Sequence, residues 1–335
     1  MRARDATIKD IASRVGVSYA TVSRALNDKY GVRPSTRERV LAASRRLGYQ
    51  PNVLARGLVT RRTMTLGLII PDITNPFFPE VARGVEEEAR QRGYGVLLCN
   101  SEWHEERERQ YVALLAERRV DGIIVAPLSS APELIDARIR SRIPVVYVSN
   151  RPHKTESGYV LIDNARGGYL AVRHLLDAGY APVGFIGSAE GYETSKQRFA
   201  GYRRALARHR QGYAERFVRF GDMKQLSGHR LLREMIEAGD LPRSVFAEND
   251  LIALGCLQAA RECGLKVPED VAIVGFDDIP FASFPEIQLT TIRQPTYEMG
   301  RMAVEVLLDD VARTPPRGKP RRLVLKPQLV VRRTA

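Results

Sequence analysis

The sequence predicts a small all-α head at the N-terminus, followed by a larger α/β body with two parallel-sheet lobes. Within the first 50 residues, apolar side chains recur at helical spacing. From residue 63 onward, short Val- and Ile-rich runs alternate with amphipathic segments, which is typical of parallel sheets covered on both faces. The 335 residues, 44% of them hydrophobic, suffice for two or three domains with cores of their own.

Composition excludes several classes of protein. Cys99, Cys256 and Cys263 form no CxxC pair, which argues against a disulfide scaffold and a cysteine-based zinc site. No apolar run approaches the roughly 20 residues of a membrane span. The first ten residues, MRARDATIKD, lack the apolar region of a signal peptide. We therefore expect a cytoplasmic protein with no membrane partner.

The net charge of +13 is unevenly distributed. Residues 1–62 carry 14 Lys and Arg against four acids, a charge of +10, and residues 313–335 carry eight basic residues and no acid. The segment between them has a charge of −5. A basic head on an acidic body indicates a polyanionic partner for the head, although a merely solvated basic surface would have the same composition.

The first helix is predicted to follow Thr7, which can cap its first turn, with Asp10 at the third helical position. Its apolar face carries Ile11 and Val15 among others, and Gly16 can end it in the left-handed conformation. Apolar side chains that recur every three or four residues specify one buried face.

A second helix is predicted for residues 19–26 behind the cap Ser18, and a third runs from Pro34 to about Leu47. The tight turn at Gly16 lets the first two helices cross closely, as in a helix-turn-helix. The outer face of the second helix carries short polar groups and one arginine: Tyr19, Ala20, Thr21, Ser23, Arg24 and Asn27. Such a face suits the DNA major groove. A helical bundle for protein contacts is the alternative, but it leaves the charge unexplained.

In the body, we expect strands in two sets. The first set is 65–70, 95–99, 122–126, 145–149 and 159–163, and the second is 183–187, 217–220, 244–248 and 271–276. Amphipathic helices lie between them, at 79–92, 105–118, 166–178, 198–209 and 250–263. Two such sets predict two similar lobes.

Polar side chains follow most of these strands. They are Asp72, Asn75, Ser149, Asn150, Asp163, Ser188, Asn249, Asp250, Asp277 and Asp278. Parallel sheets bind ligands beyond the carboxyl ends of their strands, and facing sets of such groups suit a small polyhydroxylated ligand. Some of these residues, Asp250 and Asp278 above all, could instead serve only to cap the next helix.

Nothing in the sequence points to catalysis. It contains no GxSxG, HExxH, P-loop or complete GxGxxG motif, and its five histidines are scattered. Asp277 and Asp278 are adjacent on a strand end and point in different directions, which is unsuitable for paired acid–base work. We expect no enzymatic activity, no cofactor and no metal.

The sequence resembles the LacI/GalR family of bacterial transcription regulators. The resemblance is carried by SYATVSRALN (18–27), PNVLARGL (51–58), PDITNPFF (71–78), RRVDGII (118–124), RFAGYRRAL (198–206), FAENDLIALG (246–255), VPEDVAIVGFDDIPFA (267–282) and LTTIRQP (289–295). It implies a helix-turn-helix headpiece at 1–50, a hinge helix or linker at 51–62, and a periplasmic-binding-protein-like core at 63–335. By this resemblance, lobe 1 spans about 63–161 and 291–320, and lobe 2 spans about 162–290 and 321–335.

The resemblance implies roles for residues of the head and hinge. Tyr19, Ala20 and Arg24 would approach base edges, whereas phosphates would be contacted by Thr7, Ser18, Thr21, Ser23 and Asn27. Ala20 departs from family members that carry a long polar side chain there, which leaves the base preference open. Asn52, Ala55 and Leu58 match a hinge helix that wedges a leucine into the minor groove. A linker residue packed on its own domain is the alternative for Leu58.

The resemblance also implies an effector site between the lobes. The expected residues are Asp72, Asn75, Phe77, Phe78, Trp103, Ser149, Tyr192, Thr194, Arg198, Met223, Asn249 and Asp277. Met223 stands where several members have a stacking aromatic, and Ser149 stands where others often have aspartate. These departures leave the ligand unidentified.

We therefore expect a homodimeric repressor, with a tetramer left open, that binds a palindromic DNA operator and a sugar-like effector. Ligand and DNA affinities would be coupled reciprocally. One alternative is a solute-binding protein of periplasmic type. Another is a cytoplasmic sugar-binding or sugar-modifying protein whose basic head reads no specific operator.

Overall fold

The computed structural model describes residues 6–26, 30–49, 62–127, 143–152, 155–188, 192–312 and 319–335. The chain divides into two compact units, Met1–Thr63 and Met64–Ala335, which we call the head and the core. Asn27 and the expected hinge residues Asn52, Ala55 and Leu58 lie outside the described residues. Among the described helices, none combines the length and apolar character that a membrane span requires.

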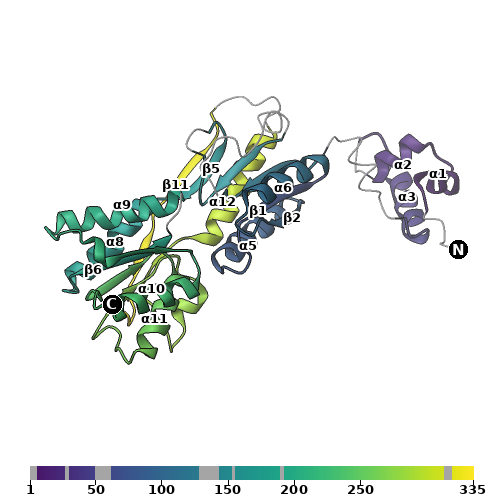
Figure 1. Cartoon of the computed structure of the whole chain (residues 1–335). Helices are drawn as coiled ribbons and strands as arrows, with labels where there is room; N and C mark the ends of the chain where they lie inside the picture. The colour runs from purple at the N-terminus through teal and green to yellow at the C-terminus, as the bar shows by residue number, and fades with distance from the viewer. Residues whose placement is uncertain are drawn as a thin grey trace. The chain divides into compact units, whose positions relative to one another are not determined.

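The head consists of helices α1 (Ile8–Val15), α2 (Tyr19–Leu26) and α3 (Pro34–Arg46), as predicted (Figure 1). Thr7 and Asp10 cap α1 reciprocally: the Thr7 N–H donates to Asp10 Oδ2 at 2.7 Å, and the Asp10 N–H donates to Thr7 Oγ1. Gly16 ends α1 with φ of +73°. A small core closes the three helices, formed by Ile11, Val15, Val22, Ala25, Val40 and Ala43.

The first lobe of the core is built on a six-stranded sheet of order β11-β5-β4-β3-β1-β2, in which every pair is parallel. Its strands are β1 (Thr65–Ile70), β2 (Gly95–Asn100), β3 (Gly122–Val125), β4 (Val145–Val148), β5 (Gly158–Ile162) and β11 (Arg322–Leu325). Its helices are α5 (Phe77–Gln91), α6 (Glu105–Glu117) and α12 (Thr296–Ala312). The strands are almost wholly apolar and buried, except at the edges β2 and β11.

The second lobe is built on a four-stranded parallel sheet of order β7-β6-β8-β9. Its strands are β6 (Val183–Ser188), β7 (Val218–Gly221), β8 (Ser244–Ala247) and β9 (Ala272–Val274). Its helices are α8 (Asn164–Asp177), α9 (Glu193–Arg208), α10 (Gln225–Glu237) and α11 (Asp250–Glu262), with short 3-10 turns at Glu215–Phe217 and Pro280–Ser283. A separate antiparallel pair joins β10 (Thr291–Arg293) to β12 (Gln328–Val330).

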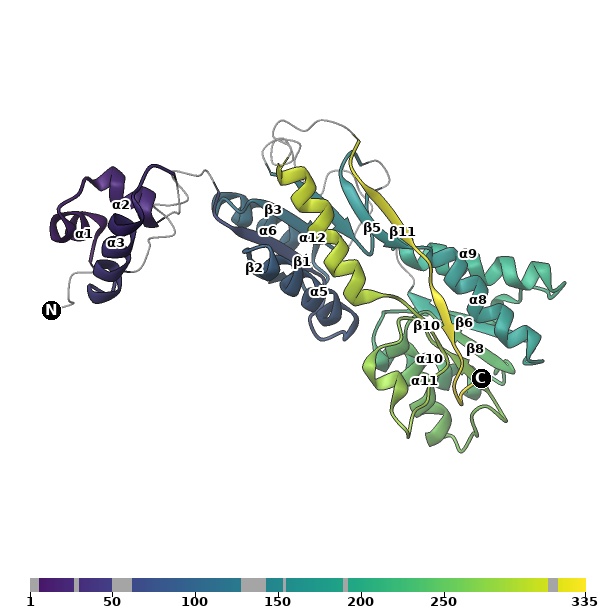
Figure 2. The same ribbon diagram turned by 180° about the vertical axis from the view of Figure 1, so that it is seen from behind.

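Two of the C-terminal strands belong to a different lobe from the one that the sequence predicted. The prediction placed 321–335 in lobe 2. Leu329 and Ala335 do pack there, but β11 pairs with β5 at the edge of the first sheet (Figure 2). The prediction placed 291–320 in lobe 1, but β10 bridges to the second lobe through Asp277 and Arg293, and Ile292 is buried in that lobe's core. Short apolar strands of this kind carry no sequence information about which sheet they join.

Some basic residues of the C-terminal segment are paired within the core. Arg321 lies 3.0 Å from Asp309, and Arg332 lies 2.7 Å from Asp278. Arg322 donates to the Thr155 carbonyl oxygen at 2.7 Å. These three side chains therefore have roles in holding the last strands in place, apart from any contact with DNA.

Three helix pairs of the core cross through paired glycines. These are α5 with α12, α8 with α9, and α10 with α11, and the glycines are Gly84 and Gly300, Gly168 and Gly201, Gly228 and Gly255. At each of the six positions, a Cβ atom would overlap a backbone carbonyl oxygen of the partner helix. Both views show α8 and α9 side by side along their length (Figures 1 and 2). The absence of a side chain is what permits this close approach.

Replacing Gly201 with alanine should destabilise the core, because the added Cβ would overlap the carbonyl oxygen of Ala165 on α8. Alanine favours a helix over glycine by about 1 kcal/mol, but overpacking costs about 1–3 kcal/mol and forces the helices apart. Urea unfolding should show a lower midpoint. Gly212→Ala is the control, since nothing lies within 4 Å of its Cβ position. An unchanged or raised midpoint for Gly201→Ala would contradict this packing.

Candidate functional site

A pocket in the core lies where the strands of both sheets end. Its empty volume is about 530 Å³, including space open to solvent. It is lined by Pro71, Asn75, Phe77, Phe78, Trp103, Ala126, Pro127, Ser149, Asn150, Tyr192, Thr194, Arg198, Met223, Asn249, Asp277 and Gln294. Most of these residues follow the carboxyl end of a strand, which is where parallel sheets bind ligands.

All the expected effector residues except Asp72 line this pocket. Asp72 accepts from Trp103 Nε1 at 3.3 Å and from the Thr74 backbone and hydroxyl, so it orients the tryptophan from behind. The expected list omitted Pro71, Ala126, Pro127, Asn150 and Gln294. Asn150 had been noted only as a strand-end residue, and nothing in the local sequence distinguishes Gln294.

Aromatic rings form one wall of the pocket and cross from one lobe to the other. Phe77 and Phe78 begin α5, and Phe78 meets Trp103 edge-on with ring centroids 6.3 Å apart. Trp103 in turn meets Tyr192 of the second lobe at 5.5 Å and 68°. Such edge-to-face pairs are favourable beyond the area they bury. The wall is apolar, and its rings lie at steep angles to one another.

Arg198 is the cation at the base of the pocket and is buried, with 6% of its surface exposed. Its Nε donates to Asn164 Oδ1 at 2.9 Å, and its Nη1 donates to the Glu248 carbonyl oxygen at 2.8 Å. Its Nη2 lies 3.6 Å from Asp277 Oδ1, and the guanidinium stacks 3.8 Å from the ring centroid of Phe276. These partners come from three different segments, so the guanidinium has a single defined orientation.

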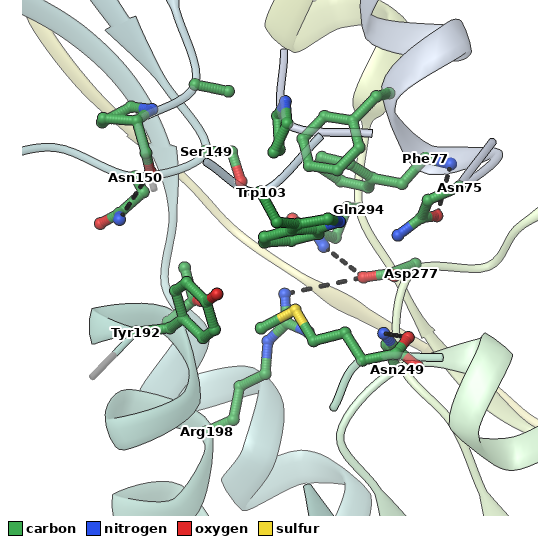
Figure 3. Close-up of a pocket in the computed structure, with 16 residues that line it drawn as sticks. Asn75, Phe77, Trp103, Ser149, Asn150, Tyr192, Arg198, Asn249, Asp277 and Gln294 are labelled. Carbon is green, nitrogen blue, oxygen red and sulfur yellow. Dashed lines mark hydrogen bonds and ion pairs between the residues drawn. The ribbon is translucent and has the colours of Figure 1, made fainter. Parts of the chain in front are cut away.

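Asp277 lies between Arg198 and Gln294 (Figure 3). Gln294 Nε2 donates to Asp277 Oδ1 at 2.6 Å. Burial raises the pKa of Asp277 to about 6, against the opposing effects of the Arg198 charge and the Gln294 hydrogen bond. The carboxyl group therefore changes its charge close to neutral pH.

Several amide groups at the pocket already have structural partners. Asn249 caps α11 by accepting from the Ile252 N–H at 2.8 Å, and its Nδ2 donates to the Met223 carbonyl oxygen. Asn75 Oδ1 accepts from the Phe77 N–H at 3.1 Å. Within the described part of the chain, the buried Gln294 Oε1 has no hydrogen-bond partner. A buried acceptor without a partner is costly, so a donor from a ligand or water would be favourable there.

Two further aspartates that follow these strands, Asp250 and Asp278, have structural roles. Asp250 is fully buried and accepts from the Ile279 N–H at 2.8 Å and from the Thr291 hydroxyl. Asp278 pairs with Arg293 and Arg332. A structural interpretation therefore holds for both, although neither acts as the cap that the sequence suggested.

Three pocket residues adopt backbone conformations that are rare for side chains other than glycine. The φ angles are +60° at Trp103, +66° at Ser149 and +120° at Asp277. Such conformations cost free energy and persist only where the surroundings enforce them, often at functional sites. Their gathering at one pocket supports a binding role for it.

On the head, α2 presents the expected face. Tyr19 is 58% exposed, and Ala20 and Arg24 are exposed beside it, whereas Val22 and Ala25 are buried. Thr21 and Ser23 are half-buried, and Ser18 Oγ accepts from the Thr21 N–H at 3.1 Å. The geometry is that of a helix whose outer face is free to enter a groove. The individual DNA contacts stay predictions.

Comparison with known proteins identifies the family. Residues 7–52 match "Bacterial regulatory proteins, lacI family", and residues 172–335 match "Periplasmic binding protein-like domain". The transcriptional repressor PurR of Photobacterium profundum is 33% identical over 98% of both chains. The chain belongs to the LacI family. Catabolite control protein A of Priestia megaterium, another relative of this LacI-family protein, is 35% identical over 90% of this chain and 91% of its own.

Solved structures extend the likeness to the whole chain. A Lac repressor dimer bound to operator and the anti-inducer ONPF has a TM-score of 0.88 at 27% identity, covering 99% of both chains. The complex of the transcriptional regulator CelR with cellobiose has a TM-score of 0.73 at 33% identity, covering 98% of this chain and 100% of its own. The LacI-family protein is thus a DNA-binding transcriptional regulator with the expected fold, and its named relatives are regulators rather than enzymes.

The raised pKa of Asp277 should make the stability of the core depend on pH. Between pH about 4 and about 6, the unfolded chain loses this proton while the folded chain retains it, so the free energy of unfolding falls as pH rises. Asp277→Asn should flatten this part of the profile, measured as urea midpoints from pH 4.5 to 7.5. A profile of unchanged slope would show that Asp277 ionises normally in the folded protein.

Proposed function

We propose that this protein represses transcription by binding a palindromic operator as a homodimer, under the control of a small neutral polyhydroxylated ligand, most simply a sugar. The observation that carries this proposal is the presence in one chain of a helix-turn-helix with an exposed α2 face and a polar–aromatic pocket between two lobes. Since a bacterial operator lies in the cytoplasm, the proposal also places the protein there.

The pocket favours a ligand with hydroxyl groups and an apolar face. Ring faces of Trp103 and Tyr192 suit the C–H face of a sugar, while Asp277 and Gln294 offer acceptors to its hydroxyls. CelR, a relative of comparable fold, was solved with cellobiose. We extend this class of ligand, though not cellobiose itself, to the present chain.

The pocket supports binding rather than chemistry on the ligand. Its aspartate, Asp277, is held by Arg198 and Gln294, and the buried Glu248 behind it accepts from Ser188 and Ser195. A general acid or base needs an unobstructed path to the proton it transfers. Asp277 is instead placed to accept from ligand hydroxyls, and Glu248 to hold neighbouring protein groups.

A homodimer is supported by the exposed edge of the first sheet. Strand β2 ends the sheet order, and Leu97 and Leu98 on it are each 44% exposed. An apolar edge strand is an aggregation liability unless it is covered. A second copy of the chain would cover it, and the Lac repressor was solved as a dimer on its operator. We propose no higher assembly.

Operator binding tests the proposal directly. A duplex is first selected from a random library with the full chain. The logarithm of its association constant should fall linearly with the logarithm of salt concentration, with a slope of about −0.9 for each phosphate neutralised. Arg24→Ala should weaken binding by about 10-fold or more, since it removes a contact to a base edge.

The matched control is Arg208→Ala, which removes the same charge from an exposed position of α9 in the core. Its operator affinity should equal that of the wild type. Failure to select any duplex, or equal losses from the two substitutions, would contradict operator reading by α2.

A further inference from the structure

Glu248 is a fully buried glutamate that does not line the pocket. It lies between β8 and α11, directly before Asn249. Its carboxylate accepts from the Ser188 N–H at 2.5 Å and from the Ser195 hydroxyl, joining the end of β6 to the first turn of α9. Its backbone carbonyl oxygen also accepts from Arg198. A single residue thus contacts Ser188 before Tyr192 and Ser195 after Thr194.

The fit around this carboxylate is close. A Cβ on Gly187 would lie 2.6 Å from Glu248 Oε2, so a side chain at position 187 would displace the carboxylate. Burying an ionised carboxylate is costly unless hydrogen bonds and an opposite charge compensate. The compensating charge is Arg198, which also faces Asp277.

Near Arg198, buried carboxylates therefore outnumber the single buried guanidinium. Arg198 lies against the Asp277 carboxylate and the Glu248 backbone carbonyl oxygen, and its charge also acts on the Glu248 carboxylate. The fully buried Asp250 adds a third carboxylate that interacts with Asp277. Asp278, which follows Asp277, also raises the pKa of Asp250 by its negative charge. Asp278 is itself paired with Arg293 and Arg332. With Glu248 and Asp277 both ionised, the cluster offers no net positive charge to an anionic ligand.

We propose that Glu248 is a positioning and specificity-determining residue of the pocket: it holds the first turn of α9 and, with Asp277, neutralises Arg198, so that the pocket selects uncharged ligands over phosphorylated or carboxylated ones. The proposal deepens the proposed function, because it concerns the ligand of the same pocket. Burial raises the pKa of Glu248, and the charge of Glu248 in turn raises the pKa of Asp277. The charge of Glu248 therefore contributes to the titration of Asp277.

A ligand-free experiment tests the shared charge and needs no operator or effector. In the full chain, urea midpoints are measured from pH 4.5 to 8 for wild type, Asp277→Asn, Glu248→Gln and the double variant. The difference between the urea midpoints of wild type and Asp277→Asn should vary with pH below about pH 6 and level off above it. In the Glu248→Gln background this change should move to lower pH, because a like charge has been removed.

Glu88→Gln is the matched control. Glu88 is also a buried glutamate paired with an arginine, Arg92 at 3.0 Å, but it lies on α5 in the first lobe. In this background the change should stay near pH 6. A change near pH 6 in the Glu248→Gln background as well would overturn the shared-charge proposal, whatever the protein binds.

The positioning role has a separate readout in amide hydrogen exchange over residues 193–198. Glu248→Ala removes both acceptors, so exchange in this turn should rise by about 10-fold or more, as expected for a loss of local stability of at least 1.4 kcal/mol. Glu248→Gln retains an acceptor for the Ser188 N–H and should rescue most of the protection. Equal exchange in Glu248→Ala and wild type would contradict the positioning role.

The selectivity is tested with inorganic phosphate as the anionic probe, followed by emission of Trp103, the single tryptophan of the chain. The wild type should show no saturable change. The double variant Glu248→Gln with Asp277→Asn, in which Arg198 keeps its charge without an acidic partner, should bind phosphate measurably. Saturable binding of phosphate to the wild type would overturn the selectivity, even if operator binding is confirmed.

Discussion

The buried guanidinium of Arg198 is the interaction on which the rest of the pocket depends. It joins Asn164 at the start of α8, the backbone after β8, and Asp277 after β9, and it stacks on Phe276. A buried charge is tolerated only where its donors are satisfied and an opposite charge is near. These requirements fix the relative positions of four chain segments, and the pocket's polar groups are placed as a result.

The close helix crossings at paired glycines make this arrangement of Arg198 and its partners sterically possible. Gly168 lets α9 approach α8 closely enough for Arg198 to reach Asn164, because a Cβ there would overlap the Arg198 carbonyl oxygen. A second crossing joins α5 and α12, whose first residues lie at or near Phe77 and Gln294. The third joins α10 and α11, which begin next to Met223 and Asn249. Tightly packed elements move as units rather than deforming gradually. A ligand that enters between these helix starts would therefore contact both packed units at once.

The sequence predicted the helices of the head, the alternation of strands and helices, and most of the pocket, because periodicity and strand-end position are local properties. Pocket residues such as Asn249 and Asp277 were identifiable from their place after apolar runs and from the family resemblance. Gln294 and Glu248 were not, because their roles arise from contacts with residues 17 and 53–60 positions away along the chain. The exchange of β10 and β11 between the lobes was missed for the same reason: strand pairing is decided by long-range packing.

A ligand in the Arg198 pocket should change operator affinity, and measuring this affinity with and without ligand tests the coupling. Neutral mono- and disaccharides, beginning with cellobiose, would be screened by Trp103 emission, and a binding sugar would be added to the selected duplex. Wild type should change its operator affinity at least 5-fold. Tyr192→Ala, which leaves the buried charges intact, should bind operator normally without this response. A full response retained by Tyr192→Ala would contradict this coupling.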